Sequence, residues 1–379
     1  MGTLFHFLPI NLLAITAFLP NALIIKLHYQ AIVILFIICL MIALLTYMLF
    51  YMYFKSKHEK KHVKWRIISD LLIRKAVFYD DDDEEAETLI PVTKRAEKLM
   101  RNKHFRALLT AEILSAKKNI TGTSAENLIH LYQQLNLEKY ALKNLKSRYW
   151  YIKAKAIQEL TVMEMKEFQT LLYPFTNNHN ELVRMEAQTA IVQFQGFEGL
   201  RFLDIIIYPI SDWQQIKLLQ QLSNVPPVYI DIDGWLKSAN SSVVVFALKL
   251  ARNYHRFELH DLILSCLDHP NPEVRLQAIH CLCEMYTDET SDQLISRFLK
   301  ESFRHQLAMI KAMQNIGSEK DILFLLSLLD DDNHEMKLSA ARALASIGKS
   351  GLTSLQDHVK SAGYPLNEIL MQIKGELAA

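Results

Sequence analysis

Hydrophobic and polar positions divide the chain into an apolar N-terminal part and a long amphipathic remainder. Residues 31–54 form one continuous apolar run without a single charge. At about 1.5 Å per helical residue, this run spans the ~30 Å hydrocarbon core of a bilayer with some tilt. We therefore predict a transmembrane helix over 31–54, followed by one large polar domain on one side of the membrane.

Positive charge gathers at only one end of this run. Six cations follow Phe54 within twelve residues, with Glu59 as the one acid among them: Lys55, Lys57, Lys60, Lys61, Lys64 and Arg66. The opposite flank offers only Lys26 and His28. Because positively charged flanks stay in the cytoplasm, we predict a cytoplasmic C-terminal part. We expect the six cations and Trp65 to lie at the membrane interface, where amphipathic rings prefer the headgroup layer.

The segment before this run, residues 1–30, is apolar but is interrupted by Pro9, Asn11, Pro20 and Asn21. It lacks the basic start and the small-residue end of a secretory signal. Two alternatives remain open: an interfacial helix with the N-terminus outside, or a first pass that forms a hairpin with 31–54. The prolines and asparagines favour the interfacial helix, because they are costly in lipid without partners. Both alternatives leave the C-terminal part in the cytoplasm.

The remainder repeats a short pattern in which an apolar residue precedes an alanine by four positions. The alanines that carry it are Ala154, Ala187, Ala247, Ala278 and Ala340. Consecutive members lie about 31 positions apart, or about twice that distance where one unit is skipped, and a period of this length is typical of stacked supersecondary units. The skipped units then lie near Ile216 and Leu307, where helical spacing continues.

Each unit is predicted to contain two helices. After Asn271, the residues Val274, Ala278 and Leu282 share one apolar face, and an amphipathic stretch over 292–299 supplies the second helix. A lone pair of this kind cannot bury both of its faces, so neighbouring pairs must stack. We therefore predict an all-α fold, an α-solenoid of about seven helical pairs over residues 147–360 with almost no strand, tethered to the transmembrane helix.

Three segments resemble the consensus of short bacterial HEAT-like repeats. They are LDDDNHEMKLSAARALASIG over 329–348, HPNPEVRLQA over 269–278 and, more weakly, NHNELVRMEA over 178–187. Residues 125–160 are further similar to membrane-anchored HEAT-repeat proteins of Bacteroidetes-type bacteria. This resemblance implies a helical-pair solenoid at a bacterial inner (cytoplasmic) membrane, near membrane glycosyltransferases. It carries no activity that can be assigned to individual residues.

These observations divide the chain into five parts. Their predicted bounds are 1–30 for the apolar segment, 31–54 for the transmembrane helix, 55–87 for a basic juxtamembrane segment and acidic linker, 88–146 for a helical cap, and 147–379 for the HEAT-like solenoid. The linker contains six consecutive acids, residues 80–85, which repel one another and favour a solvated loop. An alternative is that these acids fold back on the basic cluster and compete with anionic lipid for it.

Composition argues against several classes of function. The 42 positive and 41 negative side chains leave no global bias toward nucleic acid, and no basic stripe with interleaved aromatics recurs along the array. Glycine is scarce and Gly-rich phosphate loops are absent, so we predict no cofactor and no small-molecule substrate. The four cysteines form no disulfide framework, which fits a reducing compartment.

Two motifs resemble metal-dependent active sites. His58, Glu59 and His62 match H-E-x-x-H, in which two histidines bind zinc and the glutamate activates water. The surrounding cations disfavour a divalent ion and no third ligand is evident, so a zinc metalloprotease is a remote alternative. Asp231 and Asp233 resemble a metal-binding D-x-D, but no strand–helix pattern surrounds them, and acids at a helix N-terminus are the simpler interpretation. No catalytic or metal site is predicted.

The sequence favours a non-enzymatic scaffold that binds a protein partner through a solenoid surface. The alternative is an accessory or regulatory subunit of an inner-membrane glycosyltransferase or envelope polysaccharide system. Second helices, which include the predicted helices over 198–208 and 321–329, are expected to line the binding face.

The docking patch is predicted in the first of these helices. Ile205, Ile206 and Ile207 are consecutive, and one amphipathic stripe cannot bury all three. Phe202 and Ile206 are therefore the candidate partner-binding residues. The alternative is that Pro209 ends the helix and a neighbouring repeat covers these side chains.

Overall fold

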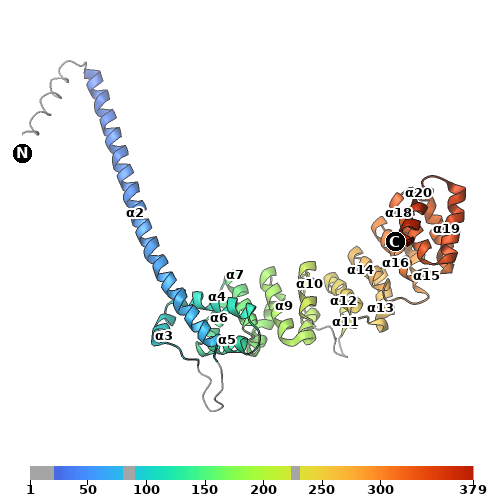
Figure 1. The fold of residues 1–379 in the computed structure, drawn as a ribbon, viewed down its shortest axis with the longest axis horizontal. Coiled ribbons are helices and arrows are strands. Elements are labelled where there is room, and N and C mark those ends of the chain that lie inside the picture. The colour runs from blue at the N-terminus through green and yellow to red at the C-terminus, as the bar shows by residue number, and fades with distance from the viewer. Residues whose placement is uncertain (1–20, 80–89, 223–230, 379) are drawn as a thin grey trace, which may run out of the picture. The chain divides into compact units, whose positions relative to one another are not determined.

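The computed structural model describes residues 21–79, 90–222 and 231–378 (Figure 1). Within these ranges the regular secondary structure is helical and contains no strand, as the all-α prediction requires. The chain divides into two compact units, Met1–Gln134 (unit 1) and Leu135–Ala379 (unit 2). The two alternatives for the segment 1–30 stay predictions, because residues 1–20 lie outside the described residues. The predicted loop over 80–85 also lies outside them.

Unit 1 is built on one helix of 57 residues, α2 (Asn21–Val77). This helix starts before the predicted transmembrane run and continues through the basic segment, so the predicted boundary at residues 54 and 55 does not interrupt it. From Tyr29 onward, α2 is long and apolar enough to cross a membrane, on length and composition. Its apolar side chains over 31–54 are exposed, as expected of a segment that packs on no other part of the chain.

The C-terminal third of α2 packs against two shorter helices, α4 (Lys103–Asn119) and α5 (Thr123–Gln134), and α3 (Lys94–Met100) packs on α4. The contacting face is a stripe with helical spacing: Trp65, Ser69, Leu72 and Ala76, all buried. The Trp65 ring meets Phe105 of α4 edge-on, with ring centroids 6.0 Å apart. The same helix that carries the membrane-length apolar run is therefore part of a folded core.

Both ends of the segment that leaves α2 and returns toward α3 are tied to α5. Asn127 donates from Nδ2 to the Tyr79 carbonyl at 2.9 Å. The Gln134 side chain accepts from the Ile90 amide at 3.0 Å and donates to the Ile90 carbonyl at 2.9 Å. Because these bonds satisfy backbone groups next to a buried helix, α5 fixes where the chain departs and where it re-enters.

Unit 2 is a solenoid of helical pairs. Within the described residues seven first helices follow one another, and these are α7 (Trp150–Val162), α9 (Glu181–Gln195), α10 (Asp212–Gln221), α12 (Ser241–Asn253), α14 (Pro272–Leu282), α16 (Phe303–Ile316) and α18 (His334–Ser346). This confirms the period, because α10 and α16 are the two units that the alanine pattern skipped. The short α6 (Glu138–Leu145) precedes them, and α19 (Lys349–Ala362) and α20 (Leu366–Ala378) follow (Figure 1).

The second members of the pairs are shorter and partly 3₁₀. They are η1 (Lys166–Phe168), α8 (Gln169–Leu172), η2 (Tyr173–Asn177), η3 (Gly196–Asp204), α11 (Ile232–Leu236), η4 (Phe257–Leu259), α13 (His260–Ser265), η5 (Cys266–Asp268), α15 (Thr290–Arg297), η6 (Phe298–Lys300), η7 (Glu319–Asp321), α17 (Ile322–Ser327) and η8 (Leu328–Asp330). The predicted second helix over 321–329 corresponds to η7, α17 and η8. The one predicted over 198–208 is wrong over its last four residues, 205–208, because η3 ends at Asp204.

Successive first helices pack directly on one another from α7 to α10 and again from α12 to α18, and the predicted alanines lie on these helices. Ala187, Ala247, Ala278 and Ala340 are fully buried, while Ala154 in the first pair is only half-buried. A side chain of one carbon lets two helix backbones approach closely, and larger residues such as Leu282 and Leu344 fill the surrounding core.

The turn before each regular first helix repeats the same hydrogen bonds. Asn180, Asn240, Asn271 and Asn333 cap α9, α12, α14 and α18, each by accepting a backbone N–H of the first turn. The amide of each cap donates in turn to the side chain two residues earlier, and these acceptors are Asn178, Ser238, His269 and Asp331. Each cap stabilises its helix by about 1 kcal/mol. Each of the three HEAT-like segments contains one of these capped turns, so the hydrogen bonds explain why the same residue types recur there.

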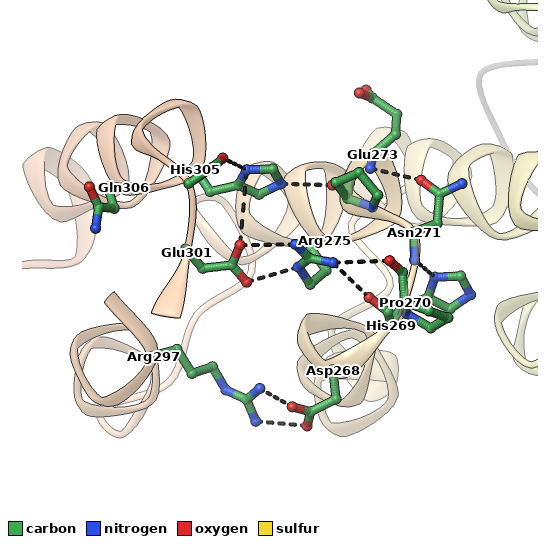
Figure 2. A network of polar contacts seen from close by, with 12 residues as sticks. Asp268, His269, Pro270, Asn271, Glu273, Arg275, Arg297, Glu301, His305 and Gln306 are labelled. Carbon is green, nitrogen blue, oxygen red and sulfur yellow. Dashed lines mark hydrogen bonds and ion pairs between the residues drawn. The ribbon is translucent and has the colours of Figure 1, made fainter. Parts of the chain in front are cut away.

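A polar network joins the repeat of α14 to the repeat of α16 (Figure 2). Arg275 donates to both carboxylate oxygens of Glu301, at 2.8 and 3.2 Å, and to the His269 carbonyl at 3.0 Å. His305 lies 2.8 Å from the Pro272 carbonyl through Nε2. Arg297 forms a two-bond ion pair with Asp268 on the second-helix side. The guanidinium of Arg275 thus connects the turn before α14, at His269, to Glu301, the acid just before α16.

We predict that Arg275→Ala lowers the free energy of unfolding by about 2–4 kcal/mol, because Glu301 is left as a poorly solvated carboxylate without its partner. The side chains of this pair are only 22% and 9% exposed. Arg304→Ala is the matched control, since its ion pair with Glu273 is 70% and 44% exposed and should cost less than about 1 kcal/mol. Urea unfolding followed by circular dichroism checks both variants, and equal shifts would contradict the prediction.

Candidate functional site

An open groove of roughly 1030 Å³ lies on unit 2. Its walls are the segment after η3, the start of α10, the end of α11 and the N-termini of α12 and α14. The groove thus lies at the ends of three first helices, in the part of the array where the helical pairs are least regular.

Side chains from neighbouring repeats hold the irregular segment 205–210 that forms one wall. Asn177 donates to the Ile205 carbonyl at 3.2 Å and accepts from the Ile207 amide at 3.1 Å. Asn240 donates to the Tyr208 carbonyl at 3.1 Å, and the Ile210 amide donates to Ser242 at 2.9 Å. The wall therefore keeps a defined conformation without belonging to a helix.

The predicted docking residues are buried beneath this wall. Phe202 is 0% exposed and Ile206 is 6% exposed, so the prediction that these two side chains form an accessible patch is wrong. Gly199 explains how η3 brings Phe202 into the core, because a Cβ at this position would lie 2.6 Å from the Ile191 carbonyl oxygen of α9.

Two other members of the isoleucine run are the accessible ones. Ile205 is 50% exposed and Ile207 is 75% exposed. Because η3 ends before Ile205, the side chain of Ile206 faces the core while those of Ile205 and Ile207 face solvent. The argument that one amphipathic stripe cannot bury all three isoleucines was therefore correct. The accessible apolar residues of this segment are therefore Ile205 and Ile207, which the sequence did not single out.

The charged residues among those described in the groove lining are all acidic: Asp204, Asp212 and Glu273. Asp204 accepts a hydrogen bond of 2.6 Å from the indole of Trp235, and Asp212 lies 3.0 Å from Lys249. The groove therefore combines an apolar wall with an acidic rim, in which Asp212 pairs with Lys249 and Glu273 pairs with Arg304.

The juxtamembrane cations and Trp65 have different environments. Lys55, Lys57, Lys60, Lys61, Lys64 and Arg66 are exposed on α2, and Arg66 lies 3.4 Å from Glu112 of α4. Trp65 is buried against Phe105, and the Lys61 ammonium lies 4.7 Å from its ring centroid. Its predicted place in the headgroup layer is wrong, because Trp65 belongs to the face of α2 that α4 and α5 cover.

The metal-like motifs gain no additional ligands from the fold. His58 and His62 lie one turn apart with ring centroids 4.4 Å from each other, and within the described part of the chain no three His, Cys, Asp or Glu side chains are grouped to hold an ion. Asp231 caps the short α11 by accepting from the Gly234 amide at 3.0 Å. The interpretation of Asp231 as a helix N-terminal acid thus agrees with the structure.

The structure brings together one serine–histidine pair that the sequence did not indicate. Ser302 Oγ lies 2.7 Å from His305 Nδ1. The other ring nitrogen faces the Pro272 carbonyl, an acceptor, so Nε2 carries the proton and Nδ1 accepts from the serine. Because His305 is buried and joins two repeats, the pair fastens α16 to the start of α14.

The cysteines are free thiols of low reactivity in unit 2. Burial raises the pKa of Cys266 to about 11 and that of Cys281 to about 12. Burial also raises the pKa of Cys283, although a hydrogen bond from Asn315 opposes the shift. A thiol rather than a thiolate is the stable form at these positions, so they lack the reactive form of a nucleophile.

Residues 259–345 match the family of HEAT repeats. This range contains the segment 269–278 and nearly all of 329–348, and the predicted HEAT-like repeats are confirmed there; 178–187 lies outside the matched range. A relative, the uncharacterized phycocyanin operon protein Z of Pseudanabaena tenuis, is 26% identical over 122 residues, which are 30% of this chain and 60% of that protein. The chain thus spans about three fifths of the relative's length.

Several solved structures are similar to the chain. An engineered protein has 16% identity and a TM-score of 0.36, with 74% of this chain and 87% of that chain covered. A designed armadillo repeat protein has 16% identity and a TM-score of 0.29, with 55% and 99% covered. Kap121p has 12% identity and a TM-score of 0.33, with 83% and 49% covered.

We predict that Phe202→Ala lowers the free energy of unfolding by about 3–5 kcal/mol, because it empties a fully buried site. The double variant Ile205→Ser and Ile207→Ser should change it by less than about 1 kcal/mol, since both side chains already face solvent. Thermal unfolding of the chain compares the two. A stable Phe202→Ala variant would contradict the burial of this residue.

We further predict that iodoacetamide leaves Cys266 and Cys281 unmodified in the folded chain near pH 8. With a pKa of about 12, Cys281 is ionised in about one molecule in ten thousand at that pH. Peptide mass spectrometry measures the modification, and the same reaction in concentrated urea, where all cysteines should react, is the control. Fast modification of Cys281 without urea would contradict the prediction.

Proposed function

We propose that the chain is a membrane-anchored, non-enzymatic scaffold whose solenoid binds a protein partner in the cytoplasm. The anchor is α2, which has the length and composition to cross a membrane from Tyr29 onward. The exposed cations that follow residue 54 favour the cytoplasmic side for both folded units, since positive flanks remain inside.

The observation that carries the binding role is the pair of exposed isoleucines on the groove wall. Ile205 and Ile207 are large apolar side chains in solvent, and the Asn177 side chain holds the backbone at both residues by donating to the Ile205 carbonyl and accepting from the Ile207 amide. An apolar surface that is already ordered loses little conformational entropy when a partner covers it. This favours a specific contact over an incidental exposed side chain.

The partner segment that fits the groove is apolar with flanking basic residues. Apolar side chains would cover Ile205 and Ile207, and lysine or arginine would face Asp204 at the rim. The resemblance to membrane-anchored HEAT-repeat proteins makes a membrane glycosyltransferase of an envelope system the first partner to look for. In that case the chain would act as its accessory subunit.

We predict that the double variant Ile205→Ser and Ile207→Ser lowers partner capture at least about tenfold, because the loss of two buried apolar contacts corresponds to that factor or more. Capture is measured by pull-down of the full chain from detergent-solubilised native membranes, with quantification of a stoichiometric partner by mass spectrometry. The glycosyltransferase hypothesis requires that this partner is one membrane synthase.

Leu299→Ser with Leu323→Ser is the matched control, because these leucines are exposed on second helices of other repeats. This control should leave capture unchanged. Equal loss in both double variants would show that the partner binds along the array, and undiminished capture by the isoleucine variant would place the interface outside the groove.

A further inference from the structure

Three consecutive aromatic residues are exposed where α7 begins: Tyr149 precedes the helix, and Trp150 and Tyr151 are its first residues. Tyr149, Trp150 and Tyr151 are 44%, 46% and 53% exposed. Their rings lie together, with centroids 5.7 Å apart for Tyr149 and Tyr151 and 5.8 Å for Trp150 and Tyr151. The Arg148 guanidinium lies 4.8 Å from the Tyr149 ring centroid and donates to its hydroxyl at 2.6 Å. We call residues 146–151 the basic aromatic turn.

The positive charge around this turn has no carboxylate within ion-pair distance among the described residues. Residues 139–158 contain no Asp or Glu and six cations, which are Lys139, Lys143, Lys146, Arg148, Lys153 and Lys155. All but Lys153 are exposed. Within the part of the chain that the structure describes, none of the six lies within ion-pair distance of a carboxylate, whereas Lys249 and Arg304 elsewhere in unit 2 each pair with an acid of a neighbouring repeat.

Three of these cations follow the exposed face of α6 toward the turn. Lys139, Lys143 and Lys146 are spaced by four and three positions, so they form one stripe, opposite the buried Ala141 and Leu145. Cations near a helix C-terminus interact favourably with the helix dipole, which accounts for Lys143 and Lys146. The dipole accounts neither for Lys139 nor for three exposed rings at the end of the stripe.

We propose that the basic aromatic turn is a second membrane contact, which binds the headgroup layer of an anionic bilayer. Tyrosine and tryptophan favour the membrane–water interface, and clustered lysine and arginine are attracted to anionic lipid. This inference goes beyond partner binding, and it rests on the proposed anchoring by α2. Single-stranded nucleic acid also uses aromatic rings with cations, but a bilayer matches a chain that carries a membrane-length helix.

Tethering makes a weak contact of this kind effective. The turn begins at Lys146, only twelve residues after Gln134, the last residue of the unit that holds α2. Even a fully extended connection of this length reaches about 40 Å. The turn is therefore tethered to the unit that α2 would anchor, and this tether raises its effective concentration near a bilayer without strong intrinsic affinity.

The experiment places the full chain in vesicles and measures quenching of Trp150 by lipid with brominated acyl chains. The chain is reconstituted in phosphatidylcholine alone and in phosphatidylcholine with about a third phosphatidylglycerol, an anionic lipid. A Trp150→Phe variant in the same vesicles is subtracted, which removes the signals of Trp65, Trp213 and Trp235. We expect the Trp150 signal to fall at least about twofold in anionic vesicles only.

Charge reversal separates specific docking from general attraction. Lys146→Glu with Arg148→Glu should abolish the quenching in anionic vesicles. Lys237→Glu with Lys374→Glu is the matched control, because both lysines are exposed in unit 2 and the change in net charge is the same. This control should keep the quenching, and circular dichroism of both variants checks that the solenoid remains folded.

Several results would overturn the membrane contact: an unquenched Trp150, equal quenching in neutral vesicles, or equal effects of the two charge reversals. Quenching of Trp150 by a single-stranded oligonucleotide, without quenching by lipid, would also overturn it and assign the turn to nucleic acid. Flotation of the vesicles after an alkaline wash distinguishes these failures. A chain that does not float contradicts the anchored scaffold and the contact together, whereas a floating chain with unquenched Trp150 contradicts only the contact.

Discussion

Direct packing of consecutive first helices, from α7 to α10 and from α12 to α18, is the interaction on which unit 2 depends. A single helical pair has two apolar faces and only one partner inside the pair, so each repeat is stable only between neighbours. The buried alanines at 187, 247, 278 and 340 allow this contact, because their small side chains let consecutive helices approach. The core is therefore continuous from repeat to repeat, and damage to one interface weakens the two pairs that share it.

Polar groups in the turns then fix how one repeat follows another. The asparagine caps define where each first helix begins, and Arg275 links one such turn to Glu301 ahead of the next helix. Apolar packing alone would allow one helical pair to shift along the next, whereas these hydrogen bonds have definite distances and directions. The regular spacing of the repeats follows from the combination of a non-directional core and directional turns.

The candidate sites lie where this regularity is interrupted. After η3, the segment 205–210 is bonded by side chains instead of by a helix, and it presents two isoleucines outward beside an acidic rim. In α2, the same helix that supplies a membrane-length apolar run also supplies Trp65 to a protein core. The chain thus uses irregular backbone to display a surface, and it uses a continuous helix to couple a proposed anchor to a folded unit.

The sequence by itself determined the features that depend on local periodicity. The uncharged run over 31–54, the alanine period and the turns before α14 and α18 were readable because neighbouring positions in one helix decide them. Tertiary structure alone decided which of Ile205, Ile206 and Ile207 faces solvent and whether Trp65 meets lipid or Phe105. The physical reason is distance along the chain: Asn177 and Asn240, about thirty residues on either side, hold the groove wall, and α4 and α5 cover Trp65. No periodicity within one segment reports such partners.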